Sequence, residues 1–195
     1  MKIPIFTISR QFGSGGRTVG KRLAERLAIP CYDQELIEKI TEESGFTREF
    51  VERSGEQMRY SSWIVGALSD RDINGHSIQD DLWSAQFSVI TQLAQQGPCV
   101  IVGRCGDYIL REREDCLRIF IHADMAHRIQ RIVQQYGQRQ DAPEKRLRDK
   151  DQRREAYYQF YTGQKWGEVK NYHLTLDSGK LGIDRCVQVI LSALG

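Results

Sequence analysis

Three glycines within four residues, Gly13, Gly15 and Gly16, separate two regular segments of the sequence. Residues 3–9 before them are rich in β-branched and aromatic side chains and predict a buried strand. After them, the apolar residues recur at helical spacing until Pro30 ends the pattern. The chain is therefore predicted to begin with a strand, a glycine-rich loop and a helix.

A loop of this kind is suited to an anion. Its backbone N–H groups point into a concavity, and the N-terminus of the following helix adds a positive dipole. Ser14 and Thr18 add hydroxyls that can reach phosphate or Mg²⁺. The alternative is a tight turn that binds nothing, but a mere turn does not require three glycines. We therefore predict a phosphate-binding glycine loop formed by Phe12, Gly13, Ser14, Gly15, Gly16, Arg17 and Thr18.

Strands and helices alternate along the rest of the chain. Apolar runs at residues 99–102 and 117–121 predict buried strands, and residues 173–176 alternate in polarity. Helical periodicity is strongest over residues 78–93 and 183–194. This alternation predicts βαβ units and a mainly parallel sheet. A chain of 195 residues without an obvious linker predicts one domain, residues 1–195.

Composition excludes several classes of protein. Hydrophobic residues make up 40% of the chain and charged residues 28%, which is typical of a soluble globular protein. The net charge of +2 gives little support to nucleic-acid binding, so any affinity for phosphate must come from clustered arginines and lysines. The chain does not begin like a signal peptide or a membrane span, and its five widely spaced cysteines suit buried thiols. We expect a cytoplasmic protein with no membrane partner.

An ordered series of motifs resembles the cytidylate kinase-like family. The segment ISRQFGSGGRTVGKRLAERL is similar to that family's phosphate loop and first helix. Similar motifs then follow in order along nearly the whole chain: Tyr32-Asp33, Val102-Gly103-Arg104, Asp151-x-x-Arg154 before Tyr157-Tyr158, Thr162-Gly163, Trp166-Gly167 and Leu181-Gly182. The resemblance implies a P-loop NTPase-type α/β/α domain of three layers with a mainly parallel five-stranded sheet. It also implies an acceptor-binding helical insert over residues 33–75 and a helical lid over residues 137–166.

The resemblance further implies an ATP-dependent phosphotransferase with Mg²⁺ as cofactor. The expected acceptor is a small nucleotide, a pyrimidine nucleoside monophosphate. Arg104 follows a buried strand and is implied to contact the acceptor's phosphate, unless it merely extends into solvent. Asp33 is the second acceptor-binding candidate, with an N-cap of the next helix as its alternative role. Thr18 is the candidate Mg²⁺ ligand, and the catalytic candidates are Arg17, Arg104, Asp151 and Arg154.

The predicted lid is rich in cations. In the helix that starts at Pro143, one face is predicted to carry Arg146, Lys150, Arg153 or Arg154, and Tyr157. In the resembled kinases, arginines of this region close over the phosphates. A solvated, salt-bridged helix is the alternative that the charge pattern alone favours.

The loop departs from the P-loop pattern G-x-x-x-x-G-K-[ST]. Arg10 stands in the place of its first glycine and Gly16 in the place of its lysine. We expect Arg17 to supply the missing charge, because its side chain can lean back toward the helix N-terminus, whereas Arg10 must bend around the next two residues. The absent lysine also supports a second hypothesis, a nucleotide-binding regulatory module with little turnover.

Other notable residues are assigned to structure. The four histidines share no metal-ligand spacing, and Asp124 is interpreted as a helix cap. Trp166 follows the lid and matches the family's pattern, which makes it the most noteworthy tryptophan. Candidates for a contact between copies of the chain in a homo-oligomer are Trp63, Ile64, Val65 and Leu68.

Overall fold

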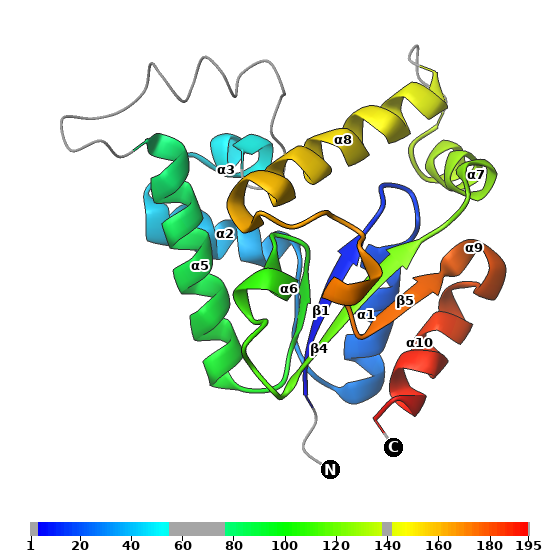
Figure 1. Ribbon diagram of the computed structural model, residues 1–195, viewed down its shortest axis with the longest axis horizontal. Helices are drawn as coiled ribbons and strands as arrows, with labels where there is room; N and C mark the ends of the chain where they lie inside the picture. The colour runs from blue at the N-terminus through cyan, green and yellow to red at the C-terminus, as the bar shows by residue number, and fades with distance from the viewer. Residues whose placement is uncertain (1–3, 55–76, 138–141, 195) are drawn as a thin grey trace.

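A five-stranded sheet forms the centre of the molecule (Figure 1). The computed structural model describes residues 4–54, 77–137 and 142–194. The strands lie in the order β2-β3-β1-β4-β5, and every neighbouring pair is parallel. Their bounds are β1 Ile5–Arg10, β2 Cys31–Tyr32, β3 Val100–Val102, β4 Cys116–His122 and β5 Leu174–Asp177. The predicted α/β class is confirmed, and the sheet is entirely parallel.

Helices cover both faces of this sheet, which gives three layers (Figure 1). They are α1 Gly16–Leu27, α2 Gln34–Ser44, α3 Arg48–Ser54, α5 Ile78–Gln96, α6 Gly106–Ile109, α7 Met125–Tyr136, α8 Pro143–Thr162, α9 Ser178–Leu181 and α10 Ile183–Ser192, with a short 3-10 turn at Val169–Asn171.

One face of the sheet packs against α1 and α10. Phe6 and Ile8 of β1 contribute to this core, and Leu23 of α1 and Ile190 of α10 cover them without solvent exposure. Because side chains alternate along a strand, the residues of β1 next to Phe6 and Ile8 point to the opposite face of the sheet. The strand alternation therefore assigns Ser9 to the face opposite α1.

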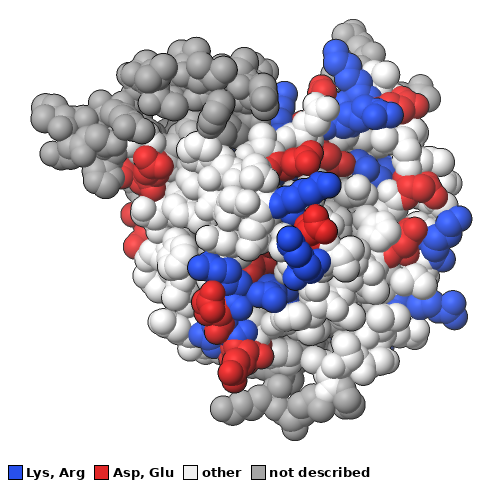
Figure 2. Space-filling model, in the orientation of Figure 1, with Lys and Arg blue, Asp and Glu red and all other residues white. Residues whose placement is uncertain are grey.

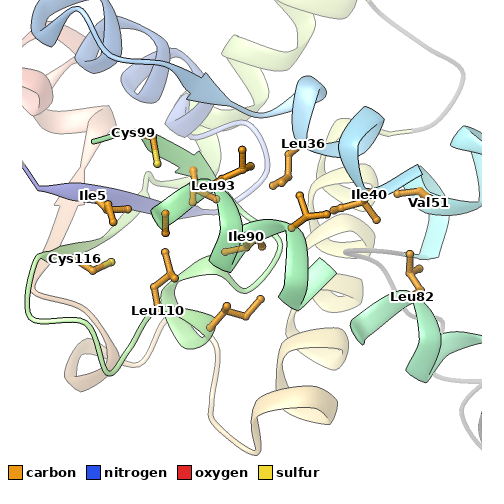
Figure 3. Close-up of a cluster of buried hydrophobic side chains, with 14 residues drawn as sticks. Ile5, Leu36, Ile40, Val51, Leu82, Ile90, Leu93, Cys99, Leu110 and Cys116 are labelled. Carbon is orange, nitrogen blue, oxygen red and sulfur yellow. The ribbon is translucent and has the colours of Figure 1, made fainter. Parts of the chain in front are cut away.

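The other face packs against α2, α3, α5 and α6. Its cluster includes Leu36, Ile40, Val51 and Ile90, which come from the first three of these helices (Figure 3). The short helix α3 has 7 residues. The helix joins this core through Val51, which is completely buried.

The regular elements follow the sequence predictions closely. Helices α2 and α5 end directly before glycines, Gly45 and Gly97. Helix α7 continues to Tyr136. Residues 55–75 of the expected acceptor insert and residues 138–141 of the expected lid lie outside the described residues, as do Trp63, Ile64, Val65 and Leu68.

The parallel arrangement brings the carboxyl ends of all five strands to one edge of the sheet. The glycine loop follows β1 at this edge, and α8 lies across it (Figure 1). Open parallel sheets bind their ligands at this edge. Among the described helices, none has the length and apolar character needed to cross a membrane.

Close packing of α1 on the sheet depends on Gly20. A β-carbon at this position would lie 3.0 Å from Val102 Cγ2 and 3.3 Å from Ile8 Cδ1. We therefore expect Gly20→Val to lower the free energy of unfolding by about 1 to 3 kcal/mol, the typical cost of overpacking a core. Lys21→Val is the control at an exposed position of the same helix, where helix propensity alone predicts a loss of about 0.5 kcal/mol. Urea denaturation measures both variants, and equal losses would show that α1 does not depend on this close approach.

Candidate functional site

The glycine loop connects β1 directly to α1. Gly13 and Gly15 adopt φ angles of +80° and +82°, in the left-handed region that favours glycine. A β-carbon at Gly15 would also lie 2.6 Å from Ile183 Cδ1 and 3.0 Å from Arg131 Cζ. The loop is thus tightly enclosed by α7 and α10.

Ser14 fixes the loop to the rest of the molecule. Its hydroxyl lies within hydrogen-bonding distance of the carbonyl oxygens of Gln11 and Ile121, at 2.9 and 3.0 Å. The Ser178 hydroxyl donates to the Ser14 carbonyl at 2.5 Å. The expectation that the Ser14 hydroxyl reaches phosphate is therefore not met, because this hydroxyl is buried and points into the protein.

Four arginines line a small pocket in the glycine loop. The pocket has a volume of about 70 Å³, and its cations are Arg10, Arg17, Arg131 and Arg154. Within the described part of the chain, no acidic residue lines it. Backbone amides and this much positive charge together favour an anion.

Arg17 is held by Asp33 in this structure. Its Nε donates to Asp33 Oδ2 at 2.5 Å, although Arg17 also lines the loop pocket. Asp33 is at the N-cap position of α2, but its side chain makes no capping hydrogen bond. A predicted phosphate ligand and a predicted acceptor ligand thus bind each other.

Arg131 of α7 lies over the glycine loop, a position that the sequence did not suggest. Its Nη2 donates to Thr18 Oγ1 at 2.7 Å. The available signal was indirect: α7 follows β4, so its first turns must start at the same edge of the sheet as the glycine loop. The order of the elements therefore predicts that α7 lies near the loop, but it does not predict which side chain of α7 contacts the loop.

Helix α8, in the predicted lid, contacts the loop through Asp151. The Phe12 N–H donates to Asp151 Oδ1 at 2.7 Å, and Arg128 of α7 donates its Nε to the Phe12 carbonyl at 2.8 Å. Arg128 and Asp151 also form an ion pair. Burial raises the pKa of the Asp151 carboxyl, although the Phe12 N–H and the guanidinium of Arg128 oppose that shift. Arg128 was absent from the sequence prediction.

Arg154 is the second contact between α8 and the end of β1. It is buried, and its Nη1 donates to the Arg10 carbonyl at 3.0 Å. The other predicted lid cations, Arg146, Lys150 and Arg153, are absent from the lining of the loop pocket as the structure describes it. Figure 2 shows Lys and Arg side chains gathering where α8 begins, mixed with Asp and Glu.

Arg104 lies on the β3 side of the edge and is only 5% exposed. The alternative that it extends into solvent is therefore wrong. Its backbone has a φ of +57°, which is uncommon for a residue with a side chain. Its Nη1 donates to the Val51 carbonyl at 2.9 Å, and its own carbonyl accepts a hydrogen bond of 2.9 Å from the buried Gln86 amide.

Two further cavities lie near the glycine loop. One, of about 300 Å³, shares Gly13 and Arg131 with the loop pocket and extends between α7 and the start of α10. The other is a cleft of about 640 Å³ beside α8, and Trp166 lines it against Phe120. Its charged lining residues within the described chain are Asp124, Asp151, Glu155 and Asp177, so this larger cleft does not suit an anion.

Protein ligands for a metal ion are few. In residues 4–54, 77–137 and 142–194, no group of three or more His, Cys, Asp or Glu side chains is positioned to hold one. The hydroxyl of Thr18 accepts a hydrogen bond from the Arg131 guanidinium, which would repel a divalent cation. Thr18 therefore fits Mg²⁺ only when Arg131 moves away.

Asp124 caps α7 through the His127 N–H at 2.8 Å, as interpreted from the sequence.

Comparisons with known proteins agree with this geometry. The model of the cytidylate kinase-like family matches residues 5–180. A solved structure from Eubacterium ventriosum, described as an uncharacterized protein, shares 26% identity over 97% of each chain, with a TM-score of 0.74. Shikimate kinase from Acinetobacter baumannii, in complex with shikimate, shares 18% identity over 98% of this chain and 93% of that chain, with a TM-score of 0.56.

A gluconokinase from Sinorhizobium meliloti shares 17% identity, over 100% of this chain and 93% of that chain, with a TM-score of 0.57. No curated protein matches the sequence. At these low identities the two kinases show a common fold alone. The family match, in contrast, includes both the glycine loop and α8, and it supports a kinase-like phosphotransferase. The chain belongs to the cytidylate kinase-like family.

Proposed function

We propose that this protein transfers the terminal phosphoryl group of ATP to a small acceptor, with a pyrimidine nucleoside monophosphate as the expected substrate. The observation that carries this proposal is the glycine-loop pocket, which four arginines line within the described residues. Phosphoryl transfer requires positive charge and positioning rather than covalent chemistry from the protein. The family match independently supports a kinase-like activity.

The sizes and the linings of the two adjoining cavities suit a nucleotide. The loop pocket of about 70 Å³ is small and cationic, which fits a phosphate tail. The cavity of about 300 Å³ continues from it past Gly13 and Arg131, and it is large enough for a nucleoside. We therefore propose that the phosphates of ATP lie in the glycine loop and that its base and ribose extend between α7 and α10.

Arg131 is our candidate for the cation that replaces the P-loop lysine. Arg128 and Arg154 bind the backbone carbonyls of Phe12 and Arg10 at the start of the loop, and Arg17 binds Asp33. Arg131 instead contacts the neutral hydroxyl of Thr18. Exchange of this partner for an anionic phosphate would form a stronger, charge-assisted hydrogen bond.

Mg²⁺ is proposed to arrive with the nucleotide. When bound, it would neutralise charge on the transferred phosphoryl group. Movement of Arg131 from Thr18 to the phosphates would free the Thr18 hydroxyl, which is our candidate ligand for the ion. Few protein ligands are needed, because Mg²⁺ in such sites binds largely through phosphate oxygens and water.

Acceptor binding is proposed on the β3 side, through Arg104 and Asp33. The Arg104 guanidinium is buried beside a neutral carbonyl, that of Val51, so an anionic group on the acceptor would be a stronger partner. Structural neighbours include a shikimate kinase and a gluconokinase, so hydroxy acids belong in any substrate test alongside nucleotides.

A regulatory nucleotide-binding module is the second candidate function. Gly16 in place of the P-loop lysine favours it, because that lysine reaches the β- and γ-phosphates in P-loop enzymes. Turnover separates the two functions, since a regulatory module needs only to bind.

We expect ATP-dependent ADP release in the presence of at least one nucleoside monophosphate. The assay couples ADP release to a spectroscopic signal and compares CMP, UMP, dCMP, AMP and GMP with shikimate and gluconate. Faster ADP release with a pyrimidine nucleotide supports the proposed acceptor. Release only with a hydroxy acid would assign a different acceptor, and nucleotide binding without any release would support the regulatory module.

Arg131→Ala is expected to weaken binding of a non-hydrolysable ATP analogue with Mg²⁺ by at least tenfold. This loss, about 1.4 kcal/mol, is on the scale of one charge-assisted hydrogen bond. Arg17→Ala is expected to have a smaller effect, because Arg17 already binds Asp33. Arg26→Ala, at the exposed far end of α1, is the control for loss of general positive charge. Calorimetric titration measures all three, and the opposite ranking would assign the lysine's role to Arg17.

A further inference from the structure

A buried carboxylate lies at the junction of β1, α6 and α8. Asp107 of α6 is only 2% exposed. Its Oδ1 accepts a hydrogen bond of 2.9 Å from the Ser9 hydroxyl of β1. Its Oδ2 accepts one of 2.7 Å from the Tyr158 hydroxyl of α8. Asp107 therefore joins the central strand of the sheet to the lid helix.

Its partners are neutral hydroxyls, and this makes the group unusual. No ion pair to Asp107 occurs within the described residues. Burial raises the pKa of its carboxyl, although both hydroxyls oppose that shift. Loss of either O–H donor would leave a buried acceptor unsatisfied, which is costly. The geometry of Tyr158 relative to β1 is consequently held within narrow limits.

Tyr158 stands close in sequence to the residues of α8 that contact the glycine loop. Arg154 precedes it by one helical turn and Asp151 by two turns. Ser9 is next to Arg10, whose carbonyl accepts from Arg154. A shift of α8 by even a fraction of a turn would separate Asp151 from the Phe12 N–H, a bond of 2.7 Å.

We propose that Asp107 is a positioning residue that sets the register of α8 over the glycine loop through Tyr158. It touches no pocket-lining atom of the loop itself and acts through the helix. This inference deepens the proposed function, because the loop and the lid are its proposed nucleotide site. The hydrogen bond that this inference explains, between the Phe12 N–H and Asp151, is nevertheless present in the protein without any ligand.

The test uses two variants. Tyr158→Phe removes the hydroxyl that donates to Asp107 Oδ2 and also lies 3.3 Å from Gln164 Oε1. Asp107→Asn replaces one of the two acceptor oxygens by an N–H donor. Tyr158→Phe keeps the ring that packs in the aromatic cluster between α5 and α8. The matched control is Tyr161→Phe. Tyr161 is on the same helix, but its hydroxyl donates to the Gln79 carbonyl at 3.0 Å, outside the Asp107 network.

The first measurement is hydrogen exchange of the Phe12 amide by NMR in the ligand-free protein. We expect exchange at Phe12 to be at least tenfold faster in Tyr158→Phe and in Asp107→Asn, and unchanged in Tyr161→Phe. The Phe6 amide, bonded to the Cys99 carbonyl inside the sheet, should stay protected in all variants and so excludes general unfolding. Unchanged exchange at Phe12, or equal acceleration in the Tyr161→Phe control, would overturn the proposal.

The second measurement is the affinity for the ATP analogue with Mg²⁺. Tyr158→Phe and Asp107→Asn should each bind the analogue at least threefold more weakly than the unmodified protein. The double variant should bind it no more weakly than the worse single variant, because both changes disrupt one shared interaction. Additive losses would contradict a common path through Tyr158. If the unmodified protein binds no nucleotide, the proposed function fails, whereas the exchange rates at Phe12 still decide whether Asp107 positions α8.

Discussion

The hydrogen bond between the Phe12 amide and the Asp151 carboxylate joins residues 139 positions apart in the chain. Arg128 completes this junction, because it pairs with the same carboxylate and donates to the Phe12 carbonyl. The glycine loop, α7 and α8 therefore share one partly buried polar contact. Much of the candidate site follows from it: Arg154 reaches the end of β1, and Arg131 on the neighbouring helix lies over Thr18.

Charge is sharply divided around this junction. On the loop side, four arginines line a small pocket without an acidic residue among the described lining. In the larger cleft beside α8, the charged lining residues are four acidic ones. Asp151 belongs to the acidic lining while its carboxylate binds the loop backbone. The division directs an anionic ligand to the smaller cavity although the larger one offers more space, because a cluster of like charges repels an ion of its own sign.

Elements with strong periodicity were predictable from the sequence. The apolar runs of β3 and β4 identified buried strands, and the stripe of α5 identified a long helix. The short helices α3 and α6 were not predictable, since a helix of 7 or 4 residues shows too few turns for a clear period. The glycine loop was predicted at the correct place in the chain. Its residues are contiguous, and the turn itself requires glycines, because Gly13 and Gly15 adopt positive φ angles.

The sequence by itself determined where the glycine loop lies, that an all-parallel or mainly parallel sheet carries it, and that a lysine is missing from it. Only the tertiary structure decided which side chains surround the loop. Arg128, Arg131 and Asp107 carry no local signal, because their importance depends on distances to residues far away in the chain. The same holds for Arg17 and Asp33, whose pairing follows from the way the start of α1 meets the end of β2. Local periodicity specifies the elements, whereas contacts between distant residues arise only when packing brings the carboxyl ends of the strands to one edge.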